Sequence, residues 1–184
     1  MLRVVSPSKR DDANHPGAHA AVSEVNDRHR RRVRIAWAIV GLFSLFVLFL
    51  GSSRFNAAET GGVLAPLLEL LFPDLDASQR YLLHRKVRKT AHVIEYAVLA
   101  LLTLRAAFIT FRTATVRIAA IALSLAFAVA ATDEARQAFL PERTGSLGDL
   151  VLDTTGAATA VALALLIRWL SRRFRGASTE SASP

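Results

Sequence analysis

Residues 114–132 read ATVRIAAIALSLAFAVAAT, and Arg117 is the only charged residue among them. A helix that crosses the hydrocarbon core of a bilayer needs about 20 mostly apolar residues. With its flanks this run is long enough, so it predicts a transmembrane helix near residues 114–135.

Three further runs have the same apolar character, at residues 33–50, 93–111 and 150–167. Together the four runs predict transmembrane helices near residues 33–51, 90–111, 114–135 and 148–169. The fold class that follows is all-α, a polytopic membrane protein with four transmembrane helices. Four such runs argue against a soluble enzyme and against a protein that binds nucleic acid.

The charged residues are segregated from the apolar runs. The chain has 184 residues, is 52% hydrophobic and still carries a formal net charge of +8. This separation predicts a disordered basic tail over residues 1–32, a membrane domain over 33–170 and a second tail over 171–184. The absence of cysteine excludes disulfides, thiolate metal ligands and cysteine nucleophiles.

The first loop, residues 51–89, is the longest one. Its apolar segment VLAPLLELLF at residues 63–72 is too short to span a bilayer and predicts an interfacial or re-entrant helix. It could form a lid over the polar residues described below or lie on the membrane surface. The following segment SQRYLLHRKVRK at residues 78–89 predicts a helix that runs into the second span, with His84 exposed to solvent.

Lysine and arginine are enriched in short cytoplasmic loops of membrane proteins. They are more numerous in the two terminal flanks and the turn after the second span than in the other loops. This distribution predicts a multi-pass protein of the cell membrane with both termini in the cytoplasm.

Polar residues recur at the same end of three successive predicted spans, the end expected to face outward. The candidate site residues are His92, Glu95, Tyr96, Asp133, Glu134, Gln137, Arg143, Asp149 and Asp153. Ionisable groups inside membrane spans are costly and indicate function by default. Residues three and four apart share a helix face, so each span carries one polar stripe, and we expect the stripes to face one another.

Two local patterns concern how the last two spans begin and pack. Ser146 and Asp149 have the spacing of a capping pair, which gives Asp149 a structural role at a helix start. Small residues recur every four positions in both spans, and such stripes allow helices to approach closely. They are Ala120, Ser124, Ala128 and Thr132 in one span and Gly156, Ala160 and Ala164 in the other.

At these residues the sequence resembles the VanZ-like membrane protein family. The resemblance rests on KTAHVIEY at Lys89–Tyr96, DExxQxF at Asp133–Phe139, PxR at Pro141–Arg143 and DxxxDxxG at Asp149–Gly156. The family pattern usually has Asn where this chain has Asp153, which adds a potential charge. The resemblance implies an envelope role at the outer leaflet and a link to teicoplanin resistance, but no particular reaction.

Three functions remain open at this point. The polar residues could bind an amphiphile, either a lipoglycopeptide or a lipid-linked wall precursor, with membrane lipids as the other partners. They could form a membrane-embedded enzyme that acts on a lipid headgroup, in which carboxylates could also hold Mg²⁺ or Ca²⁺. They could also be purely structural and lock the bundle. We expect the non-enzymatic binding role, without a cofactor or metal.

Overall fold

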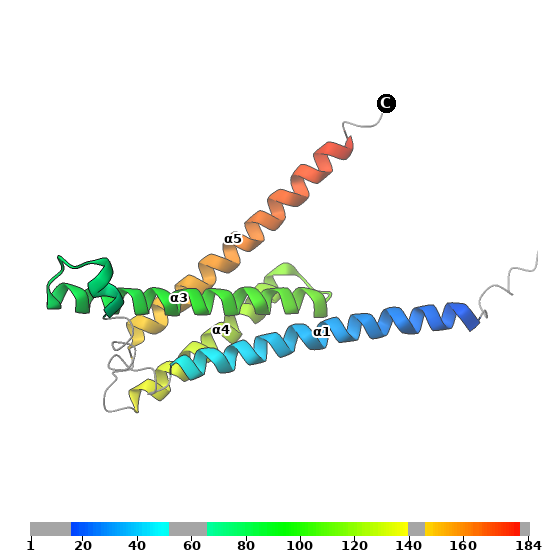
Figure 1. Cartoon of the computed structure of the whole chain (residues 1–184). Coiled ribbons are helices and arrows are strands. Elements are labelled where there is room, and N and C mark those ends of the chain that lie inside the picture. Colours follow the sequence, from blue (N-terminus) through cyan, green and yellow to red (C-terminus); the bar gives the residue numbers. More distant parts are fainter. Residues whose placement is uncertain (1–15, 52–65, 140–145, 181–184) are drawn as a thin grey trace, which may run out of the picture.

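The structure is a computed structural model that describes residues 16–51, 66–139 and 146–180. These residues form α-helices and no strand (Figure 1). The long helices are α1 (Pro16–Leu50), α3 (Ala77–Thr110), α4 (Thr115–Ala138) and α5 (Leu147–Glu180). Each contains a stretch long and apolar enough to cross a membrane. The predicted all-α fold with four potential spans is confirmed.

Helix α3 is the centre of the bundle. It packs against α1, α4 and α5, and α4 also packs against α5. The three helices that carry the polar stripes are therefore mutual neighbours, as their short connections predicted. Helices α1 and α5 diverge toward the start of α1 and the end of α5, which lie at the same end of the bundle (Figure 1).

The helices extend beyond the predicted spans at both termini. Helix α1 begins at Pro16 and α5 continues to Glu180, so residues 16–32 and 171–180 are helical where the sequence predicted tails. Arginine is a good helix former, and no glycine or proline interrupts residues 18–40, so nothing in the chain stops the helix at the membrane edge. The remaining parts of the predicted tails lie outside the described residues.

Helix α3 begins in the first loop, as predicted, and it is capped. Asp76 Oδ1 accepts from the Gln79 amide at 2.8 Å, and Gln79 Oε1 accepts from the Asp76 amide at 3.0 Å. This reciprocal pair satisfies two backbone donors at the helix start. Residues 66–71 form a short helix, and an Arg80–Glu69 ion pair of 3.1 Å ties it to α3. Whether this helix is interfacial, re-entrant or a lid stays a prediction.

The small-residue stripe of α4 was predicted on the wrong face, since Ala120, Ser124, Ala128 and Thr132 are all exposed. The face that is buried consists of Ile118, Ala122, Ala126, Val129, Ala130, Asp133 and Gln137. Because α4 is apolar around its whole circumference, spacing of small residues could not indicate which face packs. The polar pair Asp133 and Gln137 marks the buried face correctly.

Gly156 of α5 does allow a close approach, but to α3. A Cβ atom added to Gly156 would lie 2.5 Å from Val93 Cγ1 and 3.3 Å from the Val93 carbonyl oxygen. The sequence predicted tight packing between α4 and α5, whereas the closest glycine contact of α5 is with the central helix. Gly156 therefore brings α5 next to the His92–Tyr96 turn of α3.

Candidate functional site

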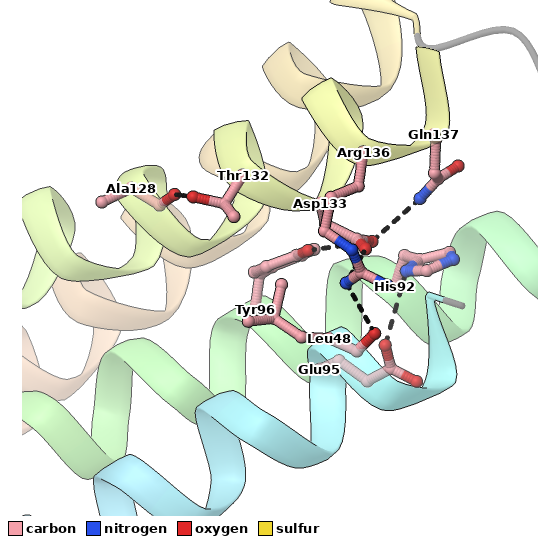
Figure 2. A network of polar contacts seen from close by, with 9 residues as sticks. All are labelled: Leu48, His92, Glu95, Tyr96, Ala128, Thr132, Asp133, Arg136 and Gln137. Carbon is pink, nitrogen blue, oxygen red and sulfur yellow. Dashed lines mark hydrogen bonds and ion pairs between the residues drawn. The ribbon is translucent and has the colours of Figure 1, made fainter. Parts of the chain in front are cut away.

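Asp133 of α4 is the centre of a buried polar network at one end of the bundle (Figure 2). Only 2% of the surface of Asp133 is exposed. Asp133 Oδ2 accepts a hydrogen bond from Gln137 Nε2 at 2.8 Å and one from the Tyr96 hydroxyl at 3.5 Å. A buried carboxylate is tolerated when donors surround it. The polar stripes of α3 and α4 thus meet here, as their helical spacing predicted.

Arg136 extends this network to α1, a contact that was not predicted from the sequence. Arg136 Nη1 lies 3.6 Å from Asp133 Oδ1 and donates to the Leu48 carbonyl at 2.9 Å. Leu48 is in the last turn of α1, where backbone carbonyls lack partners within the helix. A Cβ at Gly51 would overlap the Asp133 carboxylate, so a larger residue there would displace this side chain. No local pattern could have linked residues about 85 positions apart.

His92 and Glu95 form a second polar pair on α3, one turn from the network around Asp133. His92 Nδ1 lies 3.4 Å from Glu95 Oε2, and both side chains are 19% exposed. The His92 ring also stacks on Tyr96, with ring centroids 6.5 Å apart and an angle of 17° between the planes. Glu95 Oε2 is buried, and within the described residues the His92 imidazole at 3.4 Å is its one charged or donor contact. Figure 2 shows the pair beside the Asp133 network.

Asp153 of α5 is the third component of the cluster. It is 4% exposed, and its charge acts on the His92 imidazole and on the carboxylates of Asp133 and Glu134. No side chain of the described residues forms a hydrogen bond or ion pair with it. A buried carboxylate without a donor costs several kcal/mol unless it is protonated or contacts another polar group. Asp153 is thus a buried acid of the cluster without a hydrogen-bond donor among the described residues.

Glu134 and Asp149 have roles at the start of α5. The Ser146 hydroxyl accepts from the Asp149 amide at 3.4 Å, so Ser146 caps the helix as its spacing predicted. The reciprocal bond comes from another helix, because Glu134 Oε2 accepts from the Ser146 amide at 2.7 Å. The Asp149 carboxylate instead pairs with Lys89 of α3. These two acids therefore connect helix ends and have partners already.

The remaining predictions have mixed outcomes. Arg143 lies outside the described residues. His84 is buried, with 9% of its surface exposed, so the expectation that it is solvated was wrong. Among the described residues, no three histidine or acidic side chains are grouped closely enough to hold a metal ion. The structure brings His92, Glu95, Tyr96, Asp133, Gln137 and Asp153 together at one end of the bundle.

The fold and this cluster define a multi-pass membrane protein with buried polar groups near one end of its spans. A model of the VanZ/LLP1 family matches residues 35–168, which include all four potential spans in whole or in large part. The chain belongs to the VanZ/LLP1 family, as the sequence motifs indicated. No curated protein and no solved structure matched it significantly.

Proposed function

We propose that the polar cluster binds the headgroup of an amphiphilic envelope molecule at the outer leaflet. The ligand class is a lipoglycopeptide of the teicoplanin type or a lipid-linked cell-wall precursor. Binding would limit the access of the antibiotic to its target and so contribute to glycopeptide resistance. Membership in the VanZ/LLP1 family supports the envelope role.

The observation that carries this proposal is the unsatisfied acceptor capacity of Asp153 and Glu95. Asp153 is 4% exposed without a hydrogen-bond donor among the described residues, and buried Glu95 Oε2 has there only the His92 imidazole at 3.4 Å. A network that only locked the helices would leave few buried acceptors unpaired. Amines, amide N–H groups and hydroxyls of a ligand headgroup are the donors that would satisfy these two carboxylates.

The position of the cluster in the bundle supports a binding site at the outer leaflet. The cluster lies at the end of the bundle opposite the exposed arginines of α1 and α5. Since arginine-rich flanks stay in the cytoplasm, the cluster is expected to face outward. Arg143 follows Asp133 and Gln137 closely in the sequence. Its guanidinium group would add a bidentate donor for a carboxylate or phosphate of the ligand.

A membrane-embedded enzyme acting on a lipid headgroup is the second candidate. The observation in its favour is the His92–Glu95 pair at 3.4 Å, with Asp153 acting on the same imidazole. A histidine oriented by a carboxylate is a common general base. In that case, extracted lipid-linked precursors should carry a modified headgroup only in cells that contain the active protein.

The test of the binding function is complementation of a strain that lacks the protein. We expect the wild-type chain to restore lipoglycopeptide tolerance. The control variant Glu24→Gln, which changes an exposed acid near the start of α1, should restore it equally. We expect Glu95→Gln and Asp153→Leu to fail at equal abundance in the membrane, because each removes one acceptor charge with little change in side-chain size. Full tolerance with both cluster variants would contradict the proposal.

A further inference from the structure

A second polar feature lies near the far end of the molecule, on α5. A hollow there is lined by Arg168, Ser171, Arg172 and Arg175. Their spacing of three, four and seven residues places them on one helix face. All three arginines are exposed, so their guanidinium groups are accessible from outside the bundle.

The position of this hollow along α5 matches the headgroup layer of a bilayer. The apolar run of residues 150–167 ends directly before Arg168, and the neighbouring Trp169 is 53% exposed. Tryptophan is enriched at the membrane–water interface. From Arg168 to Arg175 the helix rises about 10 Å, comparable to the roughly 5–8 Å depth of the headgroup layer on each side of a bilayer.

The aromatic residues of the neighbouring helices indicate the same interface. Trp37 of α1 donates from Nε1 to the Thr110 hydroxyl at 2.9 Å, and its ring meets Phe111 edge-on at 6.5 Å. Thr110 ends α3, and Phe111 follows it directly. Because a polar tip and an apolar ring favour the boundary between water and hydrocarbon, these contacts place Trp37 and the end of α3 at that boundary. Arg168 contacts Phe108 in the last turn of α3, so it lies near the same depth.

The donor chemistry of the hollow fits an anion. The Arg168 guanidinium lies 4.3 Å from the centre of the Phe108 ring, which fixes it against α3. Within the described part of the chain, no carboxylate pairs with Arg168 or Arg172. The Ser171 hydroxyl donates to the Ile167 carbonyl at 2.8 Å, so the donors of the hollow are the guanidinium groups. Guanidinium groups bind phosphate oxygens in a bidentate manner.

We propose that Arg168, Arg172 and Arg175 form a binding site for the phosphate group of an anionic phospholipid. This site lies at the opposite end of the spans from the candidate functional site. A bound lipid would lie against this face of α5 and would fix the end of α5 against α3 through Arg168.

The experiment uses the full-length protein in a neutral detergent, titrated with phosphatidylglycerol or with phosphatidylcholine. Binding is followed by thermal stability and by mass spectrometry of the intact protein–lipid complex. The test variant is R168Q/R172Q/R175Q. The matched control is R30Q/R31Q/R32Q, which removes the same charge from the exposed arginines of α1.

We expect phosphatidylglycerol to stabilise the wild type and the α1 control, while phosphatidylcholine stabilises neither. The α5 variant should bind phosphatidylglycerol about tenfold more weakly or worse, since each arginine near a membrane surface contributes about 1 kcal/mol. Arg168→Gln alone should weaken binding severalfold, and it keeps the fold testable if the triple variant is unstable.

Three results would overturn the proposal. Equal losses in the α5 and α1 variants would show that binding depends on overall charge rather than on this hollow. Stabilisation of the wild type by inorganic phosphate alone, to the same extent, would assign the site to a free anion. Equal binding of the two lipids would exclude selection for an anionic headgroup.

Discussion

Asp133 joins three helices through its carboxylate and its neighbours. It receives donors from Tyr96 on α3 and Gln137 on α4, and Arg136 links it to the last turn of α1. Truncating such a residue removes the acceptor and leaves buried donors without a partner. The stability of this end of the bundle is therefore expected to depend on one side chain.

We expect Asp133→Ala to lower the free energy of unfolding by about 1–3 kcal/mol, because the Gln137 amide and the Tyr96 hydroxyl lose their acceptor. Asp27→Ala on the exposed part of α1 is the control and should change stability by less than about 0.5 kcal/mol. The measurement is unfolding of the purified protein in mixed micelles. Equal stability of the two variants would refute the structural role of Asp133.

The polar residues could be predicted from sequence, but their partners could only be predicted in part. Helical spacing correctly placed Tyr96, Asp133 and Gln137 on facing stripes, because adjacent antiparallel helices must turn polar groups inward. It did not predict that Glu134 would bond the Ser146 amide or that Asp149 would pair with Lys89. Those choices depend on helix rotation and depth, which a single sequence leaves undetermined.

At the scale of the elements, Gly156 determines how closely α5 approaches α3. The side chain of any larger residue at position 156 would overlap Val93. Gly41 of α1 offers the contrast, since a Cβ there would have no atom within 4 Å. The two glycines share a helical environment and differ in their surroundings.

We expect Gly156→Ala to destabilise the protein by about 1–3 kcal/mol through overpacking, despite the better helix propensity of alanine. Gly41→Ala should be neutral or stabilising by up to about 1 kcal/mol. Adding Val93→Ala should recover part of the loss at Gly156, because Val93 Cγ1 is the atom that would be overlapped. A stabilising Gly156→Ala would contradict the packing described here.

Helix existence was predictable because the apolar runs are long, whereas helix ends and packing faces were not. α1 begins at Pro16, because charged residues that form helices well follow it without interruption. On α4 the exposed and buried faces differ little in polarity over most of their length. The small-residue stripe was consequently assigned to the wrong side, and only Asp133 and Gln137 identified the packed one.

At the scale of the whole molecule, the two ends of the helix bundle carry different kinds of charged residues. One end carries the polar cluster, and the other carries the exposed arginines of α1, the α3–α4 turn and α5. This asymmetry is the basis for placing both termini in the cytoplasm. The absence of native cysteine makes the orientation directly measurable with single cysteine variants.

We expect a membrane-impermeant maleimide to label Ser78→Cys, at the start of α3, in intact spheroplasts. Ser23→Cys on α1 should be labelled only after permeabilisation, because arginine-rich flanks of membrane proteins favour the cytoplasmic side. Ser124→Cys, on the exposed face midway along α4, is the control and should remain unlabelled within lipid. Labelling of Ser23→Cys in intact spheroplasts would reverse the orientation.

The most direct test of the proposed binding role is titration of the purified full-length protein with teicoplanin. We predict saturable binding by the wild type and by Glu24→Gln. Glu95→Gln and Asp153→Leu should each bind at least about tenfold more weakly, since a hydrogen bond to a charged acceptor contributes about 1.5–3 kcal/mol. Binding by both cluster variants with wild-type affinity would contradict the assignment of these carboxylates to the ligand site.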